Sequence, residues 1–235
     1  MTEFKLYLIP SPINEVALEE MIPQGTLDVL RGLRVFVVEE LRTARRYLSA
    51  AGLKGHIDEL EFHTLNEHTD PSEVKALLPL FSRSDVGLIS EAGLPAVADP
   101  GASLVALCQQ HGIGVVPLSG PSSLMLALMA SGLDGQSFAF RGYLPAKPEE
   151  RRQALKGIEK MSAQLHQTQI FIETPYRNDA MLSDCLNQLS PSTRLCVAAS
   201  IGSPEAFIRT KSVGQWKQEQ TLIGKRPCVF LILAK

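Results

Sequence analysis

The sequence predicts an α/β protein built from two domains with a cleft between them. Three observations lead to this prediction. Apolar runs of strand length alternate with stretches of helical period, loops of Gly, Pro and Ser directly follow three of those runs, and the second half of the chain starts an alternation of its own. With 235 residues and 45% hydrophobic content, the chain can bury a substantial core. We place the domains at residues 1–117 and 118–235.

The first half contains four apolar runs that predict strands. They occupy residues 4–9, 34–38, 86–89 and 114–118. Continuous apolar runs joined through helical stretches favour a mainly parallel sheet that is covered on both faces. Ligands of such a sheet bind beyond the carboxyl ends of its strands, so the loops after these strands are the candidate site.

Helical periodicity connects these strands. Helices are predicted within residues 39–52 and 70–81, where Asp70 is the expected N-cap, Pro71 lies in the first turn and Glu73 completes a capping box. In the second half, residues 145–160 predict a charged helix. Three further strands are expected at residues 169–173, 195–199 and 227–234.

Three loops after strands share the same composition of Gly, Pro, Ser and Asn. They are residues 10–14 (PSPIN), 90–101 (SEAGLPAVADPG) and 119–123 (SGPSS). Such residues allow tight turns and a close backbone approach, and Asp99 and Ser119 are expected to cap the helices that follow. One such loop is an ordinary turn, but three at one edge of a sheet indicate a binding cleft.

Charge and composition narrow the function classes. A net charge of −2 gives no overall attraction to nucleic acid or membrane, so any such contact needs a local basic patch. The four cysteines and five histidines lack metal-ligand spacing, and no apolar run approaches the roughly 18 residues of a membrane span. We expect a soluble, cytoplasmic protein without a metal, whose cysteines are reduced and lie in the core.

The loops also indicate which ligand they suit. No Lys or Arg occurs between Arg83 and Arg141, and no GxGxxG follows a strand, which argues against ATP or a dinucleotide. An acidic, partly apolar site suits a neutral or cationic ligand with a ribose and a purine. S-adenosylmethionine fits this description, as one candidate among several.

Several of these segments together resemble a known family. The loops 10–14, 90–101 and 119–123, together with GYLPAK at 142–147 and IETPYR at 172–177, resemble the S-adenosylmethionine-dependent tetrapyrrole methylase superfamily. The resemblance is to its ribosomal branch, which methylates a cytidine ribose 2′-hydroxyl in small-subunit rRNA. Two segments depart from that branch: SIGSPE at 200–205 replaces its Arg-Glu-Leu-Thr-Lys, and residues 224–227 replace its Gly-Glu.

The resemblance implies a homodimer of two-domain chains with a cofactor cleft between the domains, and it implies site residues. The implied cofactor-binding residues are Pro12, Gly93, Leu94, Val97, Ala98, Ser122, Glu173, Thr174 and Ser200. The implied substrate-binding residues are Arg42, Lys147 and Arg177. Two basic clusters could contact RNA phosphates, or could be solvated helix faces with pairing of their own. They are Arg42, Arg45 and Arg46, and Lys147, Arg151, Arg152 and Lys156.

A ribose hydroxyl is a poor nucleophile, so a general base is expected within hydrogen-bond reach. The candidates are Glu91, Glu173 and Asp99. Asp99 is also placed to cap a helix, and Glu173 to pair with Arg177. We prefer Glu91, although this carboxylate could instead reach a ribose hydroxyl of the cofactor.

Three functions follow from these patterns. The first is an rRNA ribose 2′-O-methyltransferase. The second is a methyltransferase of the same superfamily that modifies a tetrapyrrole-like small molecule or a protein side chain. The third is a cofactor-binding homologue without catalysis, which the segment at 200–205 suggests.

Overall fold

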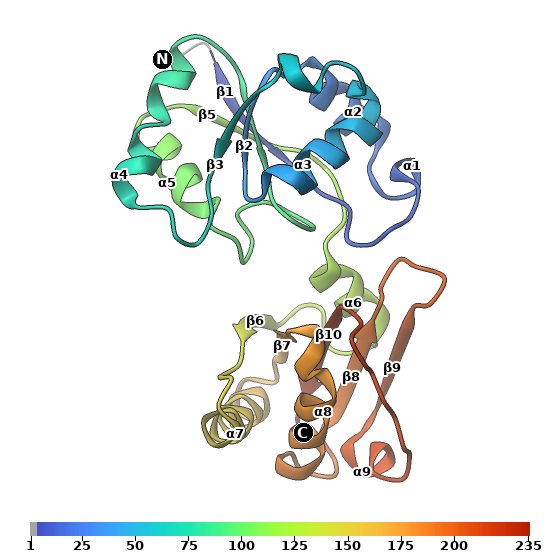
Figure 1. The fold of residues 1–235 in the computed structure, drawn as a ribbon. Helices are drawn as coiled ribbons and strands as arrows, with labels where there is room; N and C mark the ends of the chain where they lie inside the picture. The colour runs from blue at the N-terminus through green and yellow to red at the C-terminus, as the bar shows by residue number, and fades with distance from the viewer. Residues whose placement is uncertain (1–3) are drawn as a thin grey trace. The chain divides into compact units, whose positions relative to one another are not determined.

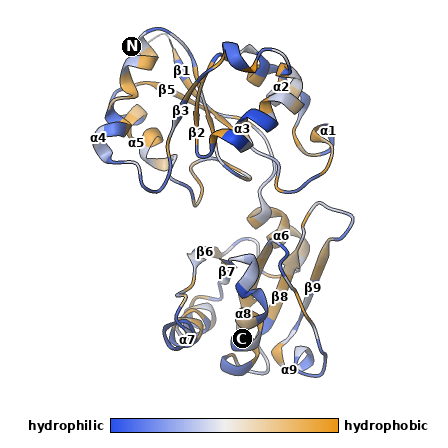
Figure 2. Cartoon of the chain, in the orientation of Figure 1, coloured by the Kyte–Doolittle hydropathy of each residue, from blue (hydrophilic) through white to orange (hydrophobic). Residues whose placement is uncertain are grey.

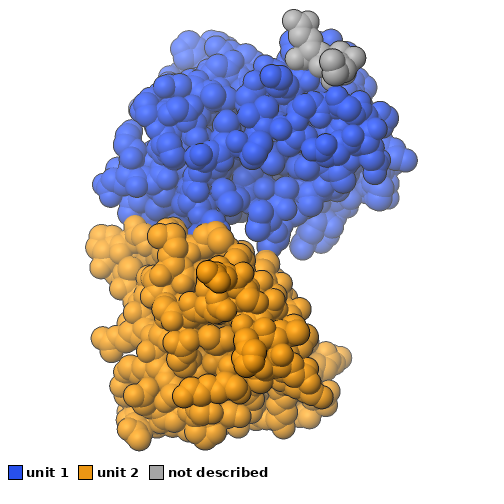
Figure 3. All heavy atoms as spheres, turned by 180° about the vertical axis from the view of Figure 1, so that it is seen from behind, with its two compact units in different colours: residues 1–122 blue, residues 123–235 orange. Residues whose placement is uncertain are grey.

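The computed structural model describes residues 4–235 and contains two compact units, residues 1–122 and 123–235 (Figure 3). Each unit has its own five-stranded sheet with helices packed against it (Figure 1). The predicted α/β class is confirmed. Within the described residues, no helix is both long and apolar enough to cross a membrane.

The sheet of the first unit is parallel throughout, with strand order β3-β2-β4-β1-β5. Its strands are β1 (Lys5–Ile9), β2 (Val35–Val38), β3 (Glu61–Thr64), β4 (Val86–Ile89) and β5 (Gly114–Pro117). Four of the five coincide with the predicted apolar runs. The edge strand β3 was not predicted, because its sequence EFHT has no continuous apolar run.

Helices cover both faces of this sheet (Figure 1). They are α1 (Leu18–Met21), α2 (Gln24–Gly32), α3 (Leu41–Leu48), α4 (Pro71–Lys75) and α5 (Ala102–Gln110), with short helical turns at Ser49–Leu53, Ile57–Glu59 and Leu78–Ser82. One hydrophobic core joins the sheet to α4 and α5, and a second joins it to α2 and α3. The predicted capping box at Asp70 and Glu73 is present at the start of α4.

The central strand β4 depends on a glycine for this packing. A Cβ on Gly87 would lie 2.7 Å from a side-chain carbon of Ile9 and 2.9 Å from the ring of Phe36. The absence of a side chain therefore allows β4 to pack closely against the second core, which keeps the ends of β1 and β4 side by side.

The sheet of the second unit is mixed, with order β6-β7-β10-β8-β9. Its strands are β6 (Phe138–Tyr143), β7 (Thr168–Glu173), β8 (Arg194–Ala199), β9 (Phe207–Ser212) and β10 (Cys228–Leu233). Only the β6–β7 pair is parallel. Strands β7, β8 and β10 were predicted from their apolar runs, whereas β6 and β9 are more polar and were not.

The helices of this unit also lie on both faces of its sheet. They are α6 (Ser123–Ser131), α7 (Pro148–Leu165), α8 (Asn178–Gln188) and α9 (Val213–Trp216), with a 3-10 turn at Pro175–Arg177. Helix α6 packs on β8, β9 and β10, while α7, α8 and α9 share one core with the opposite face. Figure 2 shows hydrophobic residues along the central strands of both units. All four cysteines are unpaired and buried, as predicted.

Candidate functional site

The three predicted loops meet at the carboxyl edge of the parallel sheet in the first unit. Ser11 and Gly93 form an isolated antiparallel bridge, with N–H to O=C distances of 2.8 and 3.0 Å between them. The third loop packs on the first, because a Cβ on Gly120 would lie only 2.2 Å from Cβ of Pro10. Gly120 is therefore required for the close contact between the first and third loops.

The loop at residues 90–101 has a strained backbone. Ala96 and Ala98 have φ angles of 65° and 60°, and an L-residue in this left-handed region costs about 1–2 kcal/mol. Gly93, at φ 75°, adopts the same region without that cost because it has no Cβ. Asp99 holds this conformation, since its Oδ1 accepts hydrogen bonds from the backbone N–H of Ala96 at 2.9 Å and of Gly101 at 2.7 Å. Strain held by such local contacts is frequent at binding sites.

The predicted helix-capping roles of two loop residues are wrong. Gly101 is the N-cap of α5 and no side chain caps this helix, because Asp99 is engaged in closing its own loop. Ser119 lies four residues before α6 begins at Ser123, and its carbonyl oxygen instead accepts the Thr26 hydroxyl at 2.8 Å.

Glu91 lies two residues beyond the buried end of β4 at Ile89 and is exposed at this edge. Its backbone N–H donates to Oε2 of Glu39 at 3.0 Å, and its carboxylate is 3.4 Å from the Thr43 hydroxyl. Partial burial raises the pKa of Glu91, and the charges of Glu39 and Glu40 raise it further. A carboxyl with a raised pKa in such a site is suited to accept a proton.

Sequence reasoning missed the role of Glu39, which positions the backbone of Glu91. The signal was present, since Glu39 and Glu40 directly follow β2, the strand beside β4. Glu40 is the N-cap of α3, where its carboxylate accepts the Thr43 N–H at 2.8 Å. Hydrogen bonds from the backbone of Thr43 and Arg42 lower the pKa of Glu40, so this carboxylate already serves as an acceptor at the start of α3.

A pocket of about 420 Å³ lies beside Glu91, entirely within the first unit. Its walls come from the loop after β1, from α1 and α3, and from the first residues after β4. The lining residues are Ser11, Pro12, Ile13, Asn14, Glu15, Leu18, Thr43, Ala44, Arg46, Tyr47, Ile89, Ser90, Glu91 and Ala92. Tyr47 is buried and its hydroxyl donates to the Pro10 carbonyl at 2.8 Å, which ties α3 to the loop after β1.

The three arginines of α3 have different surroundings. Arg45 pairs with Asp58 at 2.5 Å and lies over the ring of Phe62. Arg46 is exposed and lines the pocket, and Arg42 is exposed one helical turn before it. Arg42 and Arg46 therefore share one side of α3, and that side reaches the pocket.

The cofactor residues predicted in the first unit lie in these loops. Pro12 lines the pocket, Gly93 to Ala98 form the strained segment and Ser122 ends the loop after β5. The donor S-adenosylmethionine carries a sulfonium, an ammonium and a ribose. The site fits it, because the loops hold carboxylates, lack Lys and Arg, and contain glycines whose backbones a ligand can approach closely.

The residues predicted in the second unit share one edge of its sheet. Glu173 and Ala199 both pair with Cys228, and the N–H of Ser200 donates to the Pro227 carbonyl at 2.9 Å. Ser200 has a φ of 50°, the strained region also found in the loop after β4. Thr174 follows Glu173 directly and donates a hydrogen bond from its backbone N–H to the Glu173 carboxylate at 2.7 Å.

Glu173 pairs with Arg177, one of the two roles considered for it. The Arg177 guanidinium donates to Oε1 of Glu173 from Nε at 2.9 Å and from Nη2 at 2.7 Å, and the glutamate side chain is fully buried. The same oxygen accepts the hydrogen bond from Thr174. Its other oxygen, Oε2, is buried and accepts no hydrogen bond from the described residues. Because the Glu173 side chain is buried and Glu91 is exposed, Glu91 is the more accessible candidate base.

In the second basic cluster, Arg151 is not part of a solvated face, whereas Lys147, Arg152 and Lys156 are exposed. Arg151 is buried and pairs with Asp184 of α8, with Nε 2.7 Å from Oδ2. Arg152 reaches the other oxygen of Asp184 at 3.1 Å. Arg152 also pairs with Glu149 of the same helix at 3.9 Å, so the predicted pairing within the helix is present for Arg152, whereas Arg151 pairs with another helix. Lys147 is exposed and pairs with Glu150 at 3.2 Å.

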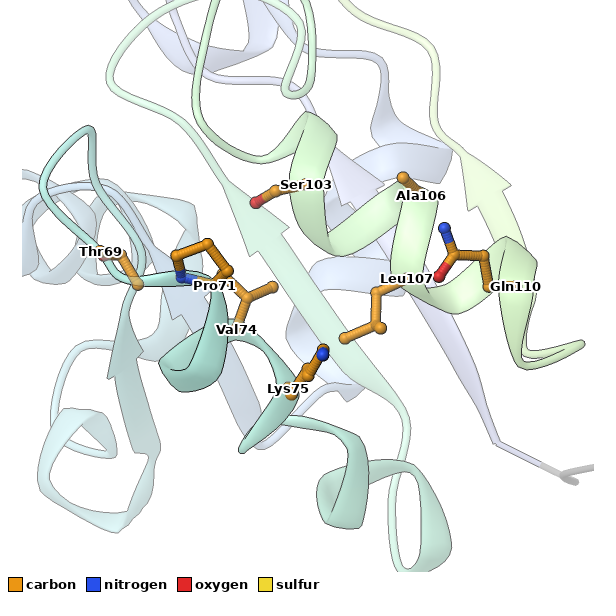
Figure 4. A pocket seen from close by; sticks show the side chains of 8 residues that line it. All are labelled: Thr69, Pro71, Val74, Lys75, Ser103, Ala106, Leu107 and Gln110. Carbon is orange, nitrogen blue, oxygen red and sulfur yellow. The ribbon is translucent and has the colours of Figure 1, made fainter.

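Another pocket lies between α4 and α5, at about 210 Å³ (Figure 4). Side chains from both helices line it, with Val74 and Leu107 among them and Lys75 as its charged group. It has no carboxylate and none of the three loops contributes to it. Within the described residues, no group of three or more His, Cys, Asp or Glu side chains is arranged to hold a metal ion.

The chain is similar in sequence to curated proteins named ribosomal RNA small subunit methyltransferase I. It is 32% identical to the protein of Escherichia coli O157:H7 over 97% of this chain and 77% of that protein. It is 34% identical to the Haemophilus influenzae protein over 98% of this chain and 78% of that protein. It is 35% identical to the Vibrio cholerae protein over 83% of this chain and 64% of that protein, so the match spans just under two thirds of that relative. No family model matches the chain.

Solved structures of methyltransferases share the fold. The methyltransferase CobJ superimposes with a TM-score of 0.64 at 14% identity, covering 99% of this chain and 95% of that one. The uroporphyrin III C-methyl transferase of Thermus thermophilus superimposes with a TM-score of 0.56 at 16% identity, and the match covers 97% of each chain. The chain belongs to the ribosomal RNA small subunit methyltransferase I family and has the fold of the S-adenosylmethionine-dependent tetrapyrrole methylases.

Proposed function

We propose that this protein transfers a methyl group from S-adenosylmethionine to the 2′-hydroxyl of a cytidine in small-subunit rRNA. The observation that carries the proposal is the position of Glu91 at the end of β4, where it adjoins both the strained loop and a pocket. Membership of the methyltransferase family supports the same reaction. The chain is shorter than its relatives, so the assignment concerns the site that the described residues form.

The loops of the first unit are proposed to hold the donor. The proposed contacts are Gly93, Leu94, Val97, Ala98 and Ser122. The N–H and C=O of Gly93 are bonded to Ser11, so Gly93 would allow close approach of the donor, and Val97 contributes an exposed apolar side chain. Fixed loops of this kind position a ligand at little entropic cost when it binds. The donor supplies a methyl group on a sulfonium whose positive charge disappears during transfer.

Glu91 is proposed as the general base. The acceptor 2′-oxygen forms a bond to the methyl carbon while the carbon–sulfur bond breaks and its electron pair stays on sulfur. The proton of the hydroxyl passes to the Glu91 carboxylate, whose raised pKa makes it a better proton acceptor than an ordinary glutamate. Glu39 keeps the backbone of Glu91 in place during this step.

An RNA acceptor is supported by the exposed arginines beside the pocket. Arg42 and Arg46 lie on one side of α3 and can approach phosphates, which the chain's net charge of −2 would otherwise repel. The buried pair of Arg151 and Asp184 removes Arg151 from this role. The proposed roles of Lys147, Arg177, Glu173, Thr174 and Ser200 rest on the resemblance.

We also propose that the protein is a cytoplasmic homodimer. An rRNA substrate places the enzyme with the ribosome, and exposed apolar side chains such as Met129, at 79% exposure, are available for a partner copy. Light scattering behind a sizing column tests the dimer directly, since a mass near that of one 25.7 kDa chain would contradict it.

The test of the function combines donor binding with methyl transfer. Calorimetry measures binding of S-adenosylhomocysteine, and radiolabelled S-adenosylmethionine reports transfer to small ribosomal subunits that lack the modification. Gly93→Trp, at φ 75°, should lose both. Gly112→Trp is the matched control, because Gly112 has a φ of 66° with open space around it.

The outcomes separate the three functions. Binding and turnover that are lost only in Gly93→Trp support the proposal. Donor binding without transfer to small subunits would favour a different acceptor or a non-catalytic homologue. No donor binding by the wild-type protein would overturn the methyltransferase assignment for this chain.

A further inference from the structure

We propose that the pocket beside Glu91 receives the acceptor nucleotide after it has been extruded from the RNA. This inference rests on the proposed function and assigns a place to its substrate. In a folded RNA the 2′-hydroxyl is displayed in the minor groove, but the faces of the base are covered by its stacked neighbours. A base can therefore enter a shaped pocket only after its nucleotide has left the stack.

The walls of the pocket suit the flat faces of a base. Ile13, Leu18, Ala44 and Ala92 contribute apolar surface, and the buried ring of Tyr47 forms part of the lining. A volume of about 420 Å³ lies within the range of about 300–1,000 Å³ that small-molecule sites occupy. The pocket therefore offers both the size and the apolar walls that a stacked base needs.

Charges at the pocket match the remaining parts of a nucleotide. Glu91 lines it as a carboxylate that can accept the proton of a ribose hydroxyl, and Arg46 lines it as a guanidinium that can bind phosphate. Arg42, one turn from Arg46 on α3, is placed for a neighbouring phosphate of the same strand. The lining also includes the carboxylate of Glu15, so Glu91 and Arg46 are the two of its three charged side chains that correspond to the polar ends of a nucleotide.

The donor is a poorer match for the same pocket. Apart from Pro12, none of the proposed donor contacts lines the pocket. After β4 the lining ends at Ala92, whereas the proposed donor contacts begin at Gly93. The backbone bridge between Ser11 and Gly93 stands where that lining ends and the strained segment begins.

The pocket is also held open by fixed contacts. The hydrogen bond from Tyr47 to the Pro10 carbonyl and the bridge from Ser11 to Gly93 connect its walls to the sheet edge. A pocket that is formed before the ligand arrives loses less entropy on binding. The nucleotide would therefore enter a preformed site rather than create one.

The experiment fills the pocket with one side chain. Ala92→Trp places an indole in the pocket from an exposed loop residue, and Ala50→Trp is the matched control, because Ala50 is exposed and outside the lining. Saturation-transfer NMR with cytidine 5′-monophosphate detects weak nucleotide binding without requiring turnover. Calorimetry with S-adenosylhomocysteine measures the donor site, and radiolabelled methyl transfer to small ribosomal subunits measures activity.

We expect Ala92→Trp to lose the cytidine 5′-monophosphate signal and at least tenfold in kcat/KM while it keeps donor affinity, and Ala50→Trp to match the wild-type protein in all three. Equal nucleotide signals and equal turnover in both variants would overturn the inference. Loss of donor binding in Ala92→Trp would also overturn it, because the pocket would then belong to the donor. Failure of the proposed function itself appears separately, as absent donor binding in the wild-type protein.

Discussion

The two units use their charged residues in different ways. In the second unit, Glu173 and Arg151 are buried and paired with Arg177 and Asp184, so their charges are used within the fold. At the edge of the first unit, Glu91 is exposed and its carboxylate accepts one long hydrogen bond from the Thr43 hydroxyl. The difference teaches that a charged residue in a recognisable motif is a functional candidate only when the fold leaves it accessible.

The two units also differ in the directions of their strands. All carboxyl ends of the parallel sheet meet at one edge, so three loops far apart in sequence come together there. In the mixed sheet, the carboxyl ends of β7 and β8 share an edge with the amino end of β10. A loop after a strand is therefore a weaker indication of a site in the second unit. Four substitutions test this contrast.

The largest effect is expected from the buried ion pair of the second unit. Arg151→Ala leaves Asp184 buried with Arg152 alone, and breaking such a pair typically costs about 3–5 kcal/mol of unfolding free energy. Urea denaturation followed through Trp216, the single tryptophan and fully buried in this unit, measures the loss. Arg152→Ala, at a half-exposed site, should cost less than about 1 kcal/mol. Similar small losses in both variants would show that Arg151 is not structural.

The next effect concerns catalysis at the first unit. Glu91→Gln removes the proposed base and should lower the rate of methyl transfer by about 10²-fold or more, with donor affinity kept. Glu20→Gln, at an exposed site on α1, should not change the rate. A rate in Glu91→Gln equal to that of the control would remove Glu91 from the mechanism.

The pH dependence sharpens the same prediction. The base must be ionised, so the wild-type rate should fall as pH is lowered through the pKa of Glu91. Because burial and neighbouring carboxylates raise that pKa, the fall should begin at a higher pH than for an ordinary glutamate, whose pKa is about 4.3. The pH–rate profile of Glu91→Gln should lack this fall at low pH. A profile that is identical in both proteins would assign the titration to another group.

A smaller effect is expected where the loops touch. Gly120→Ala places a Cβ against Pro10 and should cost about 1–3 kcal/mol through overpacking. The same substitution at Gly25, which has open space in helix α2, should stabilise the protein by about 0.5–1 kcal/mol. Differential scanning calorimetry compares the two. Stabilisation in both would mean that the loops are not in close contact.

The smallest effect is expected at Tyr47. Tyr47→Phe removes the hydrogen bond to the Pro10 carbonyl, which is worth about 1 kcal/mol. Tyr176→Phe, at a residue that is 69% exposed, should leave the unfolding temperature unchanged. An equal unfolding temperature for both variants and the wild-type protein would show that this bond does not fix the wall of the pocket.

Much of the fold could be predicted because its signals are local. Buried strands need continuous apolar runs, and helix α4 needs the capping residues Asp70 and Glu73, which are three residues apart in sequence. Strands β3, β6 and β9 were missed because each has a more polar sequence and lies at the edge of its sheet. The role of Asp99 was mistaken because a loop and a helix N-terminus use the same residue types.

The sequence by itself determined the two α/β units, the three loops, the family and the candidate residues, because each depends on residue types at fixed spacing. Only the tertiary structure decided which charges are available, since pairing joins residues far apart in the chain. Arg151 meets Asp184 across two helices, whereas Arg46 and Glu91 reach one pocket from separate elements. The physical reason is that burial and ion pairing depend on distances in space, which spacing along the chain does not contain.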